Sequence, residues 1–198
     1  MDLTGLSVTF GVMAGVIQLI GYFVYLKLSK GKANTGSWLI WTLSAVVDLI
    51  SYSYVTGGDI VKEILPAACA LACVLTFSYL LIKGRFGKPD KADWFMIGAD
   101  TAISIAWWQQ IMNAIAANLM LQVSTVASAF PMVRGILKGK EKESLAPWVI
   151  WTTAYACHIV SVSTSLDRWE ELAYPVANGF MNVAVIMAIL YKLRSSRI

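Results

Sequence analysis

The sequence predicts an all-α membrane protein with seven transmembrane helices, arranged as two parallel three-helix bundles joined by a linker helix. Three observations lead to this fold class. Hydrophobic residues make up 58% of the 198-residue chain and charged residues only 14%, which exceeds what a soluble domain needs for its core. The chain contains seven apolar segments. A pattern around Trp38 also recurs 110 residues later, around Trp148.

The apolar segments are the candidate helices. Six of them approach the roughly 20 residues that a helix needs to cross a bilayer. The fourth is shorter, is interrupted by Asp100 and ends in a polar run, which favours a linker helix. Their expected bounds are Leu6–Leu28, Trp38–Thr56, Ile60–Ile82, Trp94–Trp108, Met112–Leu137, Trp148–Ser165 and Leu172–Leu193.

The linker helix determines how the two bundles relate. Residues 1–83 form the first three-helix bundle, 84–110 the loop and linker helix, and 111–198 the second bundle. An odd helix between two three-helix units leaves both units in the same orientation. The repeats are therefore expected to be parallel, related by an axis along the membrane normal.

The basic residues predict the orientation. Only Lys62 and Arg168 fall on one side of the predicted topology. The remaining basic residues follow helices one, three, five and seven, on the side that the positive-inside rule makes cytoplasmic. They are Lys27, Lys30, Lys32, Lys83, Arg85, Lys88, Lys91, Arg134, Lys138, Lys140, Lys142, Lys192, Arg194 and Arg197. We expect a multi-pass protein of a bacterial plasma membrane, with the N-terminus outside and the C-terminus cytoplasmic.

The sequence gives little indication of a disulfide-rich, metal-binding or secreted protein, or of an enzyme. The three cysteines lie in apolar segments, without disulfide or metal spacing. The N-terminus has no signal-peptide pattern. No metal cluster, phosphate loop or nucleophile motif appears, so we expect neither an enzyme nor a cofactor. The expected partners are a small polar solute and the lipid bilayer, without nucleic acid; a homo-oligomer stays open.

Two ionisable residues lie at equivalent depths of the repeat. Asp48 follows Trp38 by ten residues, and His158 follows Trp148 by ten, which places both near the middle of the bilayer. Such groups usually face a bundle interior or a wet cavity. They can form an acid–imidazole pair that carries a proton or holds a solute, or a structural hydrogen bond that stabilises the bundle.

Amides and thiols occupy a second pair of equivalent positions. Asn178 and Asn182 share one face of the last helix, and the repeat places Cys69 and Cys73 at the matching positions. A neutral amide both donates and accepts hydrogen bonds, which fits a sugar-like or amide-like solute. The alternative is interhelical stabilisation, which asparagine also provides in membranes.

Helix-breaking residues mark candidate hinges. Pro131, Pro66 and Pro175 interrupt the hydrogen bonding of their helices, and a kink of this kind is either a hinge or a fixed bend. Pro131 lies near the cytoplasmic end, where a gate would close, and its repeat partner is Gly21.

Paired tryptophans begin the second and sixth helices. Trp38, Trp41, Trp148 and Trp151 either form an interfacial aromatic belt or line the inner mouth of a cavity. Other polar residues in the apolar segments are further candidates for a cavity lining: Gln18, Ser44, Gln122, Ser124 and Ser128.

These features resemble those of the SWEET and PQ-loop superfamily of transporters. The shared features are the seven-helix layout, a proline near the end of the first helix of a repeat, and a basic loop after it. Pro131-Met132 stands at the PQ position, with Gly21-Tyr22 in the first half. The run Pro175-x-x-Asn178-Gly179 resembles the Pro-Asn signature of the last SWEET helix, where the asparagine contacts sugar.

Two other likenesses accompany this one. The runs 36–41 and 51–52 are most similar to uncharacterised bacterial seven-helix members of the superfamily. The Trp-x-x-Trp pairs are also similar to those of nicotinamide-riboside transporters.

The predicted function is a membrane transporter, a facilitator for a small polar solute such as a sugar, working by alternating access. Asp48 and His158 leave proton coupling open. The alternatives are a transporter of a vitamin or nucleoside, and a ligand-binding receptor or scaffold of the same fold, as the KDEL receptor resembles this fold yet sorts cargo.

Overall fold

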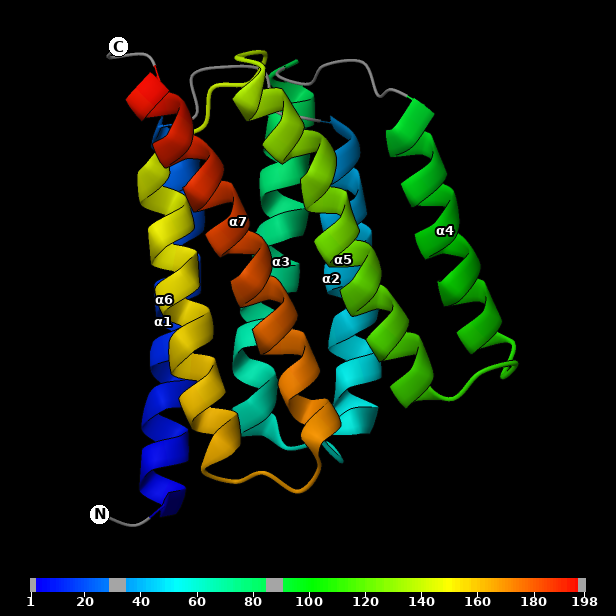
Figure 1. Ribbon diagram of the computed structural model, residues 1–198. Coiled ribbons are helices and arrows are strands. Elements are labelled where there is room, and N and C mark those ends of the chain that lie inside the picture. The colour runs from blue at the N-terminus through cyan, green and yellow to red at the C-terminus, as the bar shows by residue number, and fades with distance from the viewer. Residues whose placement is uncertain (1–2, 29–34, 85–90, 196–198) are drawn as a thin grey trace.

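The computed structural model describes residues 3–28, 35–84 and 91–195. Over these ranges all regular structure is helical, so the predicted all-α fold is confirmed. The elements are α1 (Leu3–Leu28), α2 (Thr35–Val55), α3 (Ile60–Ile82), α4 (Lys91–Trp108), α5 (Ala114–Leu137), α6 (Leu145–Ser163), the short 3-10 helix η1 (Trp169–Leu172) and α7 (Ala173–Ser195). Successive helices run in opposite directions (Figure 1).

Six of these helices are long and apolar enough to cross a membrane: α1, α2, α3, α5, α6 and α7, the last counted together with η1. The protein is therefore a multi-pass integral membrane protein. Among the described residues, α4 is not one of these candidate spans; it is 18 residues long and contains the charged residues Lys91, Asp93 and Asp100.

The observed helix ends differ from the predicted ones by a few residues, because caps rather than apolar runs end a helix. Asn113 caps α5 by accepting a hydrogen bond from the backbone N–H of Ala116, at 2.8 Å. Met112, predicted as helical, therefore lies before the helix. Asp59 caps α3 in the same way. Gly57 and Gly58, with φ of 66° and 81°, make the tight turn between α2 and α3.

Helix α1 shows a pattern of burial expected in a membrane protein, with mostly small and polar side chains on its inner face and large apolar ones exposed. The buried face of α1 carries Ser7, Gly11, Ala14, Gly15, Gln18, Gly21, Tyr22 and Tyr25. Its exposed residues include Val12, Val16, Leu19 and Phe23. Small residues let helices approach closely: a Cβ at Gly15 would lie 2.6 Å from the Ile64 side chain of α3.

The six candidate spans pack as two similar sets. We call α1–α3 the first half and α5–α7, with η1, the second half. In the first half α3 contacts both α1 and α2, and in the second half α7 contacts both α5 and α6. The halves meet through α1 against α6 and α2 against α5. Helix α4 lies at one edge of the bundle, beside α5 (Figure 1), and contacts α2 and α5.

The charge asymmetry predicted from the sequence is present among the described residues. Helices α1, α3, α5 and α7 all finish at the end of the bundle where the C-terminus lies (Figure 1). We call this the basic end, because it carries Lys27, Lys83, Lys91, Arg134, Lys138, Lys140, Lys142, Lys192 and Arg194. Lys62 and Arg168 lie at the opposite end. Lys30, Lys32, Arg85, Lys88 and Arg197 lie outside the described residues.

Candidate solute-binding site

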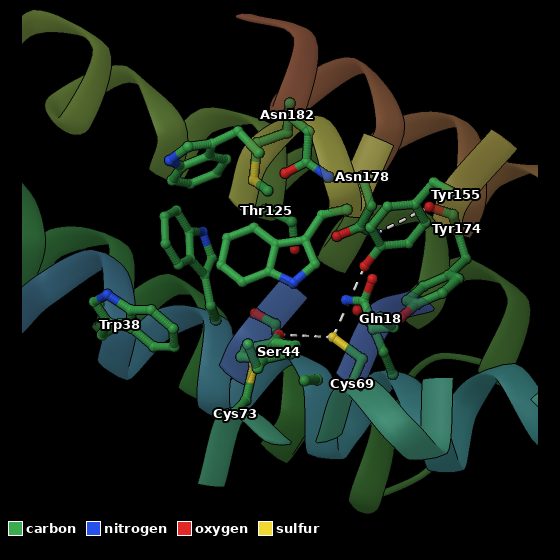
Figure 2. Close-up of a pocket in the computed structure, with 17 residues that line it drawn as sticks. Gln18, Trp38, Ser44, Cys69, Cys73, Thr125, Tyr155, Tyr174, Asn178 and Asn182 are labelled. Carbon is green, nitrogen blue, oxygen red and sulfur yellow. Dashed lines mark hydrogen bonds between the residues drawn. The ribbon is translucent and has the colours of Figure 1, made fainter. Parts of the chain in front are cut away.

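A small cavity lies in the middle of the bundle, where the two halves meet. All six candidate spans contribute to its lining (Figure 2), and its volume is about 40 Å³. That is room for roughly three water molecules. Of the residues predicted for the site, the lining includes Asp48, Asn178, Asn182, Cys69, Cys73, Trp41 and Trp151. Residues far apart in the sequence therefore meet around one space.

Asp48 is held in this cavity by amides of α5. Its carboxylate oxygen Oδ1 accepts hydrogen bonds from Gln122 Nε2 at 2.8 Å and from Asn118 Nδ2 at 3.4 Å. Only 2% of the residue is exposed. The partners of Asp48 are thus neutral amides of the opposite half.

The predicted pair between Asp48 and His158 does not form. His158 is fully buried but does not line the cavity, and neither ring nitrogen has a hydrogen-bond partner. The imidazole instead packs against the rings of Tyr52 and Tyr174, with centroids 6.2 Å away in each case. The two residues have equivalent positions in the predicted repeat, but this equivalence did not determine which way each side chain points.

The two asparagines of α7 differ in their bonding. Asn178 Nδ2 donates to Gln122 Oε1 at 3.1 Å and to the backbone oxygen of Tyr174 at 2.9 Å. Asn182 Nδ2 is buried and has no partner. Asn178 therefore belongs to the framework of the site, and Asn182 is left with a free donor at the cavity wall.

The two thiols of α3 share a tyrosine. The hydroxyl of Tyr22 lies 2.8 Å from the Cys73 sulfur and 3.2 Å from the Cys69 sulfur. Cys69 is also 3.8 Å from the Tyr155 hydroxyl of α6. These contacts connect α1, α3 and α6 at the level of the cavity.

The paired tryptophans form a buried aromatic cluster, which we define as Tyr22, Tyr25, Trp38, Trp41, Trp148 and Trp151. The ring centroids of Trp41 and Trp148 are 5.9 Å apart, so the two halves meet directly here. The alternative of a lipid-facing belt is wrong for these residues, because all four tryptophans are at most 8% exposed. The cluster covers the side of the cavity toward the basic end.

The four candidate hinge residues lie in different structural settings. Pro66 and Pro131 lie inside α3 and α5, which continue through them. Pro175 lies in the first turn of α7, where the missing N–H breaks no hydrogen bond, so its predicted interruption of the helix is wrong. Gly21 instead packs closely against α6: a Cβ at this position would overlap with the indole ring of Trp151.

Several polar atoms around the cavity have no protein partner. They are Gln18 Oε1, Thr125 Oγ1, Asn182 Nδ2 and Trp151 Nε1, all buried and all on lining residues; Gln18, Thr125 and Asn182 are labelled in Figure 2. A buried polar atom without a partner costs about 1–3 kcal/mol. This cost is recovered when a polar ligand or water fills the cavity, so the unpaired atoms mark where a ligand would be bound.

A buried ion pair closes the bundle at the end opposite the basic end. Lys62 Nζ lies 2.8 Å from Glu171 Oε2, and both side chains are 1% exposed. Lys62 also donates to the backbone oxygen of Ser165 at 2.6 Å. The Tyr52 hydroxyl donates to the backbone oxygen of Glu171 at 2.8 Å. The first half is thereby tied to the segment that precedes α7.

At the basic end, a carboxyl group contacts the aromatic cluster. Trp148 Nε1 donates to Glu143 Oε2 at 3.3 Å. Burial raises the pKa of Glu143 to about 7, against the opposing effect of the hydrogen bond from Trp148. The loop before α6 therefore carries a carboxyl group with a pKa near neutral pH, next to the aromatic cluster.

Some lining residues were not among those predicted. Tyr22, Tyr155, Tyr174 and Thr125 all line the cavity. The available signal was their spacing: Tyr22 lies four residues after Gln18, Tyr155 four after Trp151, and Tyr174 four before Asn178, so each shares a helix face with a predicted site residue.

Comparisons with known proteins give no further assignment. No protein-family model matches the chain, and no curated protein or solved structure matches it.

Proposed function

We propose that this protein is a transporter that carries a small polar solute across the membrane by alternating access. The two halves act as equivalent three-helix units in the same orientation, linked by α4, and the solute binds in the cavity between them. In this proposal the basic end is cytoplasmic, the N-terminus is outside, and the membrane is a bacterial plasma membrane. The proposal includes membership of the SWEET and PQ-loop superfamily.

The observation that carries the proposal is the cavity with its unpaired polar atoms. Gln18 Oε1 accepts hydrogen bonds, Asn182 Nδ2 donates them and Thr125 Oγ1 does either. They come from α1, α7 and α5, so a solute that satisfied all three would contact both halves. A ligand that bridges two bodies can stabilise their approach, which is what alternating access requires.

The contacts at the two ends of the bundle are consistent with a movement of the halves relative to each other. The Lys62–Glu171 pair joins α3 to η1 at one end. The aromatic cluster joins α1 and α2 to α6 at the other. Both sets of contacts cross the boundary between halves, so a rocking motion would break one while keeping the other. The cavity of about 40 Å³ is smaller than a sugar, and loading such a solute requires the halves to separate.

Uptake by liposomes tests this function. Purified protein would be reconstituted and supplied with radiolabelled sugars, nucleosides, polyols and amines, with and without a pH gradient. The proposal predicts saturable uptake of at least one solute above protein-free liposomes. Absence of uptake across the panel, by protein whose thermal melting shows that it is folded, contradicts it. Dependence of uptake on the pH gradient identifies a proton-linked transporter.

A further inference from the structure

We infer that the solute carries a positive charge, and that it binds between the carboxylate of Asp48 and the aromatic walls of the cavity. This inference rests on the proposed function and narrows its substrate class to small organic cations. Three features of the cavity lead to it: its charge balance, the bonding of Asp48 and the composition of its walls.

The charge of the cavity is not balanced by protein groups. Of the 17 residues that the structure describes as lining it, one is a carboxylate, Asp48, and none is lysine, arginine or histidine. Lys62 is engaged by Glu171 at the end of the bundle. A carboxylate at this depth is costly in a membrane unless a cation or a proton accompanies it.

The bonding of Asp48 suits an ionised carboxylate. Its Oδ1 accepts from the amide nitrogens of Gln122 and Asn118, which can only donate. Gln122 is itself held by Asn178 Nδ2, so the amide that donates to Asp48 is fixed in orientation. Among the described residues, no ion pair involves Asp48, and its second oxygen accepts no hydrogen bond. That oxygen is available to a ligand.

A second carboxylate adds to the negative charge near the cavity. Asp100 of α4 accepts hydrogen bonds from Ser44 Oγ, at 2.7 Å, and from Ser124 Oγ. Ser44 lines the cavity one helical turn from Asp48. Both partners of Asp100 are neutral hydroxyls, so two carboxylates lie close to one cavity without a nearby basic side chain among the lining residues.

The walls of the cavity are aromatic. Four tryptophans and three tyrosines line it: Trp38, Trp41, Trp148, Trp151, Tyr22, Tyr155 and Tyr174. The faces of such rings attract organic cations, by about 0.5–2 kcal/mol per ring in a desolvated site. A cavity with one carboxylate, aromatic walls and no basic lining residue is therefore suited to binding an ammonium or guanidinium group. Asn182 and Gln18 are available to hydrogen-bond the polar part of the solute.

Matched pairs of charged and neutral ligands test the inference. Guanidinium and urea have nearly the same shape, as do choline and 3,3-dimethylbutan-1-ol, and only the first of each pair is a cation. Binding to detergent-solubilised protein would be followed by tryptophan fluorescence, because four tryptophans line the cavity. Uptake of the same compounds by liposomes would be measured separately. We expect each cation to bind about tenfold or more tightly than its neutral partner.

The variant Asp48→Asn removes the charge and keeps an oxygen acceptor for Gln122. We expect it to abolish the preference for cations, so that each cation binds no more tightly than its neutral partner. Asp167→Asn is the matched control, because it removes one carboxylate at a residue that is 82% exposed and outside the cavity. It should bind both members of each pair as the unmodified protein does.

The outcomes separate the two proposals. Preferential binding of cations without uptake supports the charge assignment and contradicts transport. Uptake that does not distinguish the members of a pair, or that favours sugars, overturns the charge assignment and retains transport; Asp48 would then hold a proton. Failure of every cation to bind to folded protein, or an unchanged preference in Asp48→Asn, also overturns the inference.

Discussion

Gln122 joins the two halves of the protein at the level of a single residue. Its amide nitrogen donates to Asp48 of α2, and its oxygen accepts from Asn178 of α7, at 2.8 and 3.1 Å. Both hydrogen-bonding ends of the side chain are therefore used by the protein. The neighbouring polar residues Gln18, Thr125 and Asn182 each keep an atom free. This difference separates residues that hold the site together from those available to a ligand.

The two asparagines of α7 test that separation. Asn178→Leu removes two hydrogen bonds and should lower stability by about 1–2 kcal/mol. Asn182→Leu removes a donor that has no partner, so its melting temperature should stay the same or rise, while solute affinity falls. Thermal melting in detergent and a binding assay measure the two effects. An equal loss of stability in both variants would show that Asn182 is structural.

Gly21 provides a second test at the residue scale. Gly21→Val would drive its side chain into Trp151 and should cost about 1–3 kcal/mol through overpacking. The control Gly179→Ala places a Cβ 3.6 Å from Tyr155, an ordinary contact, and should melt within a few degrees of the unmodified protein. A tolerated Gly21→Val would mean that this position is a flexible hinge and not a packing contact.

At the scale of the helices, the sequence predicted where the helices lie along the chain, but it did not predict which side of each helix faces the cavity. Apolar runs predict helices, because every span must cover its backbone with apolar side chains in a bilayer. The repeat predicts depth, since equivalent residues lie at equivalent levels. Rotation about a helix axis depends on packing between helices, and for this reason Asp48 reached the cavity while His158 turned toward Tyr52 and Tyr174.

The ion pair between α3 and η1 can be tested by breaking it. Glu171→Gln leaves the buried Lys62 ammonium group with two more distant carboxylates, those of Asp59 and Asp167 at 3.8 and 3.7 Å, and with the backbone oxygen of Ser165. A cost near 3 kcal/mol is expected, at the lower end for a broken buried pair. Asp167→Asn, on an exposed partner, should change stability by less than about 0.5 kcal/mol. A Glu171→Gln protein as stable as the original would show that the pair does not hold this end closed.

The loop before α6 should respond to pH through Glu143. Its pKa is raised from 4.5 to about 7 by burial, so the folded protein holds a proton on this group that the unfolded chain has released. Stability should therefore fall as pH rises from about 5 to about 7, and level off above. Glu143→Gln should remove this decrease. Melting temperatures measured from pH 5 to pH 8 compare the two proteins, and identical slopes would contradict the assignment.

For the whole molecule, the equivalence of the halves connects the fold to the proposed function. In each half the third helix contacts the other two. The halves contact each other through two helix pairs, α1 with α6 and α2 with α5. A similarity of this kind is what the predicted repeat leads us to expect. The full lining was harder to foresee, because the only sequence signal for its tyrosines is their spacing of four residues from predicted site residues.

The native cysteines allow the central claim, access to one cavity from both membrane faces, to be measured without adding a residue. Cys69 and Cys73 line the cavity and Cys157 does not. A membrane-impermeant methanethiosulfonate reagent would be applied to sealed right-side-out and inverted vesicles, and labelled peptides identified by mass spectrometry. The proposal predicts that Cys69 or Cys73 reacts in both vesicle types, that a transported solute slows the reaction, and that Cys157 stays unlabelled. Labelling from one face only would indicate a receptor, and labelling from neither face, in folded protein, would contradict a transport pathway through this cavity.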